Sequence, residues 1–203
     1  MAPKKRKAEQ SGDDTKASKK KAPATTQRKA KKEVAPKPKA PFYLFKSEPS
    51  CYSIDALAKE PEATTEWDGV RNYQARNLMQ GMKVGDRGFY YHSNCKPPGI
   101  VGIVEVAKEA HPDYTAWDPK DDHYDPKSSE DDPRWFMVDI KLIRKLKRMI
   151  SLPELKEYAG SELKDMVLVN KSRLSVQPVG EKEWEFIMGL EEQEESEEKD
   201  ADE

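Results

Sequence analysis

The sequence has few of the residues that build disulfide frameworks, metal sites or membrane spans. Two cysteines, Cys51 and Cys95, occur in 203 residues, which is too few for a disulfide framework and is typical of a reducing compartment. The histidines and cysteines form no HxxxH, HxE or CxxC pair, so chain spacing predicts neither a metal site nor a cofactor. No run of 18 apolar residues is present, which predicts no transmembrane helix and no membrane partner.

Motifs for catalysis are also missing. The chain contains no GxxxxGK phosphate loop and no GxGxxG turn. The acidic segment 118–132 departs from a calcium-binding loop, because Pro126 stands where the loop needs glycine and Asp132 where it needs a bidentate glutamate. His92 and Ser93 are neighbours on a predicted strand and point to opposite faces, so they cannot act on each other. These absences favour a non-enzymatic protein with no catalytic residues.

Charge divides the chain into three parts. Residues 1–40 carry about +10 and contain one branched aliphatic residue and no aromatic residue, so they are predicted to be a disordered basic tail. Residues 191–203 carry −8 and are predicted to be a disordered acidic tail. The remaining segment, 41–190, contains every aromatic residue and has the usual size of one domain.

The basic tail contains a candidate targeting signal. The five residues Pro3, Lys4, Lys5, Arg6 and Lys7 read PKKRK and are typical of a nuclear localisation signal. They predict residence in the nucleus and recognition by a nuclear import receptor. A basic arm that contacts nucleic-acid phosphates is a second reading, compatible with the first.

The pattern of the central segment predicts an α+β domain. Strands are expected over residues 42–47, 87–93, 99–109 and 135–148, where β-branched and aromatic residues concentrate. Short helices are expected after Ser53 and Ser151, over 74–82 and over 181–190. Residues 64–73 are expected to form a loop, and 166–179 a strand, a turn and a second strand. Because the order is not a regular βαβ alternation, a mixed or antiparallel, barrel-like sheet flanked by short helices is predicted.

Two stretches combine aromatic, arginine and amide side chains, namely EWDGVRNYQARN (66–77) and GFYYHSN (88–94). A pocket for a planar base needs aromatic faces for stacking and polar groups for the base edge. Trp117 belongs to the same aromatic set, although a small core would account for some of its members. Arg71 and Arg76 either brace this loop or reach a phosphate. Lys141, Arg144 and Lys145 either contact phosphates or protect an edge strand from aggregation.

These stretches, together with FKSEP (45–49), GIVGIVEV (99–106), YDPKS (124–128), PRWFMVDI (133–140) and SRLSVQPV (172–179), resemble the EVE domain family, whose fold is PUA-like. The resemblance covers nearly all of residues 41–190. It implies a pocket that holds a modified base. By motif, the resemblance assigns the pocket walls to Lys46, Ser47 and Glu48; to Trp67, Val70, Asn72 and Tyr73; to Tyr91, His92 and Ser93; and to Arg173, Leu174 and Ser175.

The function expected from these observations is that of a nuclear, monomeric reader of a modified base. The resemblance implies a modified cytosine in DNA, 5-hydroxymethylcytosine among the candidates, with DNA favoured over RNA. A hydrolase acting on modified nucleic acid is a rival, for which Glu48 and Asp68 are the candidate metal-binding carboxylates. An adaptor whose charged tails bind chromatin proteins is another.

Overall fold

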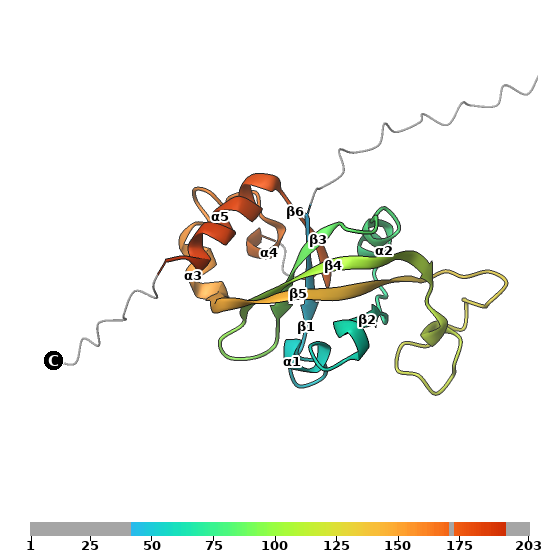
Figure 1. Ribbon diagram of the computed structural model, residues 1–203. Helices are drawn as coiled ribbons and strands as arrows, with labels where there is room; N and C mark the ends of the chain where they lie inside the picture. Colours follow the sequence, from blue (N-terminus) through green and yellow to red (C-terminus); the bar gives the residue numbers. More distant parts are fainter. Residues whose placement is uncertain (1–41, 171–172, 194–203) are drawn as a thin grey trace, which may run out of the picture. The chain divides into compact units, whose positions relative to one another are not determined.

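The computed structural model of the protein describes residues 42–170 and 173–193 (Figure 1). The predicted basic tail with its nuclear localisation signal lies outside the described residues, as do residues 194–203 of the predicted acidic tail. Among the described residues, no helix is long and apolar enough to cross a membrane.

Six strands and a set of short helices make up the domain, which is α+β as predicted. The elements are β1 (Phe42–Ser47), α1 (Ile54–Leu57), the 3₁₀ turn η1 (Pro61–Ala63), β2 (Thr64–Trp67), α2 (Tyr73–Met79), β3 (Arg87–His92), β4 (Gly99–Pro112), the 3₁₀ turn η2 (Tyr114–Ala116), β5 (Phe136–Ser151), α3 (Leu152–Glu157), α4 (Val167–Asn170), β6 (Val176–Val179) and α5 (Glu181–Glu191).

The strands form one mixed sheet in the order β2-β5-β4-β3-β1-β6. β1 and β3 are parallel, and every other neighbouring pair is antiparallel. β4 and β5, with 14 and 16 residues, form the long central hairpin that is visible along the molecule in Figure 1. The sheet has two edges in its pairing, β2 and β6.

The sheet curls around an inner core, as expected for a barrel-like fold. Each of the six strands contributes at least one buried side chain to a single cluster, and these include Tyr43, Trp67, Tyr90, Val104, Val138 and Val176. A flat sheet could not bring its two edge strands, β2 and β6, into one cluster. The curvature therefore places the end of β2 near the strands at the far side of the sheet.

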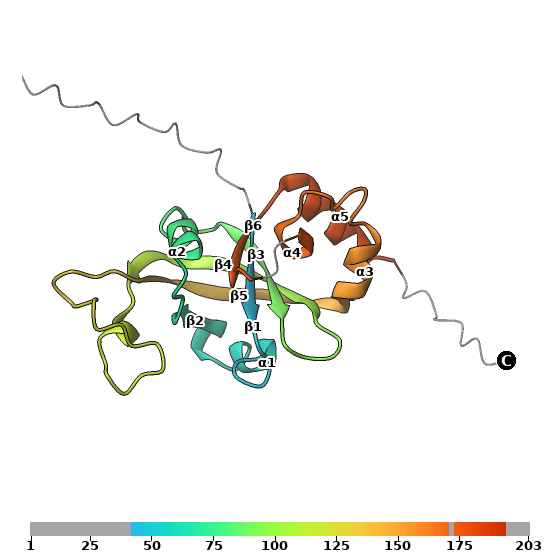
Figure 2. The ribbon, with the colours of Figure 1, turned by 180° about the vertical axis from the view of Figure 1, so that it is seen from behind.

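A second core lies on the other face of the central strands, under α3, α4 and α5, which gather at one end of the molecule (Figure 2). Strand alternation divides the side chains between the two cores, so Phe45 and Tyr90 face the inner core while Leu44 and Tyr91 face the second. Trp184 of α5 stacks on Phe89 with ring centroids 4.1 Å apart. Trp184 is thus a core residue, as its helical spacing predicted.

Two local expectations were wrong. Residues 64–67 form strand β2 because they pair with β5, where Trp67 lies opposite Val138. Residues 167–170 form helix α4, although the β-branched sequence there favours a strand. Leu168 is buried in the second core, and this packing outweighs the local preference. The helix caps at Ser53 and Ser151 are confirmed, since each hydroxyl accepts a backbone N–H of the first turn.

Candidate functional site

A cavity of about 430 Å³ opens where β1 and β2 end. Its walls come from four separate parts of the chain: the end of β1 and the turn that follows it, β2 and the loop after it, the acidic segment 118–132, and the residue before β6. Its lining consists of Lys46, Ser47, Cys51, Tyr52, Thr65, Glu66, Trp67, Asp68, Gly69, Val70, His123 and Ser175.

Five residues of the predicted pocket line this cavity, namely Lys46, Ser47, Trp67, Val70 and Ser175. The end of β1 is joined to the residue before β6 by a backbone hydrogen bond, in which Lys46 N donates to Ser175 O at 2.9 Å. Ser47 Oγ donates to Tyr52 O at 2.8 Å, and Tyr90 Oη donates to the same carbonyl at 2.9 Å. These bonds hold the turn after β1 in place, so the wall containing Tyr52 is pre-formed.

Trp67 supplies the aromatic wall. Its ring packs edge-to-face against Phe45 at 5.4 Å and Tyr90 at 5.7 Å between centroids, and 8% of the residue is exposed. Burial of three large aromatic side chains fixes the orientation of the indole without a hydrogen bond. The small exposed part of Trp67 belongs to the cavity lining.

The loop after β2 depends on a glycine. Gly69 has a φ of +68°, in the left-handed region that glycine adopts at little cost. A Cβ at this position would also lie 2.7 Å from His123 Nε2, so the histidine ring packs directly on the glycine. The acidic segment thus reaches over the loop and completes the cavity with His123.

Asp113 holds the loop after β2 in place through hydrogen bonds. Its carboxylate is fully buried and accepts hydrogen bonds from Gly69 N at 3.0 Å, Arg71 Nη1 at 2.6 Å, and both the N–H and the hydroxyl of Thr115. Arg71 Nε also donates to His123 O at 2.6 Å. One arginine therefore ties the cavity loop to the segment that covers it.

Arg71 and Arg76 both brace the fold, which is one of the two roles that the sequence left open. Arg76 donates to Arg134 O at 2.9 Å and to Asn77 Oδ1, and its guanidinium lies 4.7 Å from the centroid of the Tyr73 ring. Tyr73 is half exposed and stacks on Trp135 at 4.8 Å. Tyr73, together with the partly buried Arg76 and Arg134, lies outside the cavity lining.

Nine predicted pocket residues do not line the cavity. Glu48 accepts a hydrogen bond from Asn94 at 3.0 Å, and Asn72 caps helix α2 by accepting from the N–H groups of Gln74 and Ala75. Tyr91 is buried in the second core because strand alternation turns it away from Trp67. The others are Tyr73, His92, Ser93, Trp117, Arg173 and Leu174.

His92 and Ser93 instead support the turn after β1. His92 Nε2 accepts the backbone N–H of Ile54 at 3.1 Å, so the proton of the neutral ring sits on Nδ1. Burial lowers the pKa of His92, and nearby Asp55 raises it by a smaller amount. The Ser93 hydroxyl donates to Ser47 O at 3.3 Å. Both side chains therefore hydrogen-bond to the backbone around the turn after β1 and do not line the cavity themselves.

Two of the three predicted phosphate contacts on β5 are paired with carboxylates. Arg144 forms a bidentate pair with Glu191 at 2.5 and 2.7 Å, and Lys145 pairs with Asp55. Neither these two residues nor Lys141 lines the cavity. The sequence missed the pairing with Glu191 because the acidic tail was expected to be solvated from residue 191 onward, whereas the Glu191 side chain is 0% exposed.

The cavity combines acceptors with few cations. Glu66 and Asp68 contribute carboxylates, and the pKa of Asp68 is raised, first by burial and then by the charge of nearby Asp113. Burial lowers the pKa of Lys46. Such a cavity suits a ligand that presents N–H donors, and a bound phosphate would face the two carboxylates.

Seven lining residues were absent from the predicted pocket, namely Cys51, Tyr52, Thr65, Glu66, Asp68, Gly69 and His123. The first six lie within four positions of a predicted pocket residue in the chain, so extending each motif by a few residues would have found them. His123 had no such signal, because it reaches Gly69 from 54 positions away. Among the described residues, one group has metal-ligand atoms close together: Glu66, His111 and Asp139.

Comparison with known proteins identifies the class to which this fold and cavity belong. The chain is a member of the EVE domain family, whose profile matches residues 41–190. It is 48% identical to thymocyte nuclear protein 1 of Homo sapiens over 169 residues, which cover 76% of this chain and 75% of the relative. The nuclear residence predicted from the basic tail agrees with the name of this relative.

Solved structures confirm the predicted PUA-like α+β fold. The DUF55 domain of human thymocyte nuclear protein 1 superposes with a TM-score of 0.73 at 48% identity, covering 75% of this chain and 99% of that domain. A second structure, of human THYN1 protein in complex with DNA that contains 5-methylcytosine, matches with the same TM-score and identity over 75% of this chain and 98% of that one.

Proposed function

We propose that this protein is a nuclear, non-enzymatic reader of modified cytosine in DNA, which receives a flipped-out base in the cavity. The observation that carries the proposal is the lining, in which a preorganised Trp67 and the apolar Val70 stand beside hydrogen-bonding groups. Its volume of about 430 Å³ falls within the usual range for small-ligand pockets, roughly 300–1,000 Å³. The complex of the human relative with methylated DNA supports the same class of ligand.

The cavity offers a partner for each distinctive part of a modified cytosine. The exocyclic N4 amine of cytosine is a donor, and carboxylates accept from it. Asp68 is the carboxylate at the end of the aromatic wall. A 5-methyl group fits the apolar surface of Val70 and Trp67, whereas a 5-hydroxymethyl group would also use the hydroxyl of Ser47 or Ser175. 5-Hydroxymethylcytosine therefore remains a predicted ligand beside 5-methylcytosine.

The DNA backbone would follow the cationic surface outside the cavity. Arg76 and Arg134 flank the half-exposed Tyr73, whose hydroxyl accepts a hydrogen bond from Arg134 at 3.2 Å. The Arg76 guanidinium lies over the Tyr73 ring and makes three bracing hydrogen bonds, which leaves N–H groups free for phosphate oxygens. The basic segment 1–40 would add salt-dependent affinity and an import-receptor signal, and the protein would act as a monomer.

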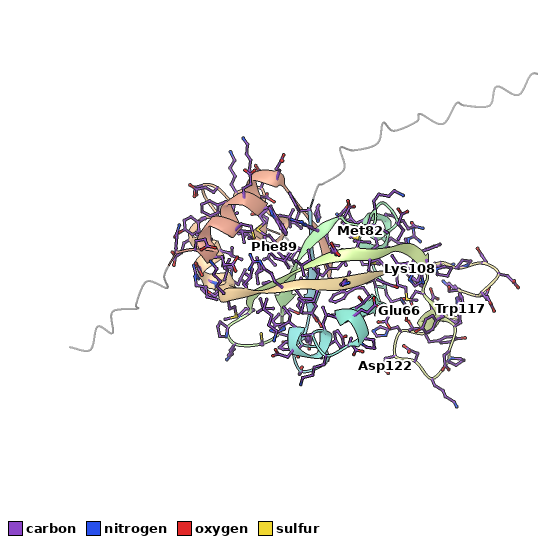
Figure 3. All side chains as sticks on the ribbon, in the orientation of Figure 1. Glu66, Met82, Phe89, Lys108, Trp117 and Asp122 are labelled. Carbon is purple, nitrogen blue, oxygen red and sulfur yellow. The ribbon has the colours of Figure 1, made fainter. Side chains whose placement is uncertain are left out.

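The test is a titration of the full chain against matched DNA duplexes that carry cytosine, 5-methylcytosine or 5-hydroxymethylcytosine, at two salt concentrations. The decisive variant is Asp68→Asn, which keeps the shape of the side chain and removes an acceptor. Asp122→Asn is the matched control, since Asp122 is exposed on the covering segment and does not line the cavity (Figure 3).

We expect wild-type protein and Asp122→Asn to prefer a modified base at both salt concentrations, and Asp68→Asn to bind all three duplexes more weakly, by about 1–3 kcal/mol where the base enters the cavity, because the N4 amine is common to the three bases. Equal, salt-sensitive binding to all three duplexes would refute the reader function. A preference for the same modification in RNA oligonucleotides of equal sequence would assign the cavity to RNA. Cleavage of the duplex or release of the base during the titration would contradict the non-enzymatic reading.

A further inference from the structure

A cluster of metal-ligating side chains lies beside the cavity, and one of its members, Glu66, also belongs to the cavity lining. Glu66 of β2, His111 of β4 and Asp139 of β5 come from three neighbouring strands, and one ligand atom from each lies within 4.8 Å of the other two. His111 Nε2 is 2.7 Å from Asp139 Oδ1. We propose that these three residues form a binding site for a divalent cation of the Zn²⁺ or Co²⁺ class.

The first argument is the pairing of the strands. Glu66 and Asp139 are direct partners in the antiparallel pair of β2 and β5. Like charges directly opposite each other destabilise a sheet. None of the lysines and arginines that the structure describes forms an ion pair with either carboxylate. A bound cation would neutralise both carboxylates, and each would then be attracted to the cation between them.

The second argument is the chemistry of the donor set. An imidazole nitrogen with two carboxylate oxygens is a ligand set that Zn²⁺ takes up in proteins, with metal–ligand distances of about 2.0–2.2 Å. Ligand atoms at that distance in a tetrahedron lie roughly 3.4 Å apart. The three side chains therefore need a contraction of their longest separation and a small widening of the His111–Asp139 contact. Glu66 is exposed, so its side chain would make the larger movement together with the half-exposed Tyr114 that is hydrogen-bonded to it.

A support for the ligands is already in place. Tyr114 Oη donates to Glu66 Oε2 at 2.5 Å, which is the kind of outer hydrogen bond that orients a metal-bound carboxylate. Tyr114 begins η2, directly after Asp113, which holds the cavity loop. Figure 3 shows Glu66 at the end of the sheet remote from Phe89 and the helical layer.

A cation at this site would clamp β2 to the central strands. β2 is an edge strand of four residues, and three of them line the cavity. Because a ligand that binds only the folded state stabilises it, metal binding would raise the unfolding temperature. It would also hold the cavity wall that contains Thr65 and Trp67.

The test is a titration of the full chain with CoCl₂, followed by visible absorption and reversed with ZnCl₂, together with thermal unfolding in the presence and absence of ZnCl₂. The ligand variants are His111→Asn and Glu66→Gln. Glu109→Gln is the control, because Glu109 is an exposed carboxylate on the same strand as His111 and pairs with Lys83 outside the cluster.

We expect one equivalent of metal to bind the wild-type chain and Glu109→Gln, and His111→Asn to weaken that binding by at least about tenfold. The Glu66→Gln variant distinguishes a metal-binding role of Glu66 from a role in stabilising the fold without metal. It should unfold at the same or a higher temperature than wild type without metal, since it removes the facing like charge, and should gain little from ZnCl₂.

Two results would overturn the proposal. One is the absence of saturable binding to the wild-type chain. The other is binding that His111→Asn and Glu66→Gln leave unchanged, which would place the metal elsewhere, for example on the acidic residues 194–203. If His111→Asn fails to fold, the comparison of Glu66→Gln with Glu109→Gln decides alone.

Discussion

Two arginine–carboxylate pairs hold opposite regions of this domain, and they differ in what they position. In the cavity region, Arg71 binds the fully buried Asp113, which also accepts the N–H of Gly69. In the helical region, Arg144 of β5 binds the buried side chain of Glu191 at the end of α5. Both pairs are short and both carboxylates are buried, whereas the arginine side chains are 21% exposed at Arg71 and 39% exposed at Arg144. Only the first holds residues that line the cavity, so the same type of contact serves binding in one region and stability in the other.

The largest expected effect comes from removing the carboxylate of the cavity region. Asp113→Ala would leave Arg71 without its partner and would free the N–H of Gly69, which we expect to cost about 3–5 kcal/mol in the free energy of unfolding. Ligand affinity should fall as well, even under conditions where the variant is fully folded. Chemical denaturation and the DNA titration measure the two effects, and unchanged affinity in the folded variant would break the link between Asp113 and the cavity.

The matching change in the helical region is Arg144→Ala, for which we expect a loss of about 1.5–3 kcal/mol, because the charged hydrogen bonds to Glu191 disappear. DNA affinity should stay at the wild-type value once the protein is folded. A parallel loss of affinity would show that the two regions are coupled.

This pair also predicts a pH dependence. Hydrogen bonds from Arg144 hold the pKa of Glu191 below its ordinary value. A carboxylate whose folded-state pKa is lowered contributes stability above its unfolded pKa, about 4.3, and this contribution is lost as the pH falls through the folded value. The stability difference between wild type and Arg144→Ala should therefore shrink below about pH 4. A difference that stays constant down to pH 2 would contradict this origin.

The smallest effect should come from Gly69→Ala, and Gly85→Ala is its matched control. Both glycines have positive φ values, +68° and +85°, so an alanine costs about 1–2 kcal/mol of backbone strain at either position. A Cβ at Gly85 meets nothing within 4 Å, whereas a Cβ at Gly69 meets His123. We expect a loss of stability at least as large for Gly69→Ala as for Gly85→Ala, because His123 must shift, and weaker DNA binding only for Gly69→Ala. Equal affinities would mean that His123 does not need its place over the loop.

Local sequence determined much of this protein. β-branched and aromatic runs specify the central strands, and the hydroxyls of Ser53 and Ser151 specify helix starts, because these preferences depend on residues a few positions apart. The motifs also predicted Lys46, Ser47, Trp67 and Val70 as pocket residues, and all four line the cavity. Extending the same motifs by a few residues would also have predicted the neighbouring residues of the cavity lining.

Only the tertiary structure decided which of the remaining polar residues meet. Thr64–Trp67 is a strand because β5 offers it hydrogen bonds, and Arg144 is neutralised by Glu191 from 47 positions away. Likewise, His123 covers Gly69, and Glu66 meets His111 and Asp139, only because the curled sheet and the long hairpin bring them together. Such contacts depend on the register and curvature of strands far apart in the chain, which no local pattern of residues specifies.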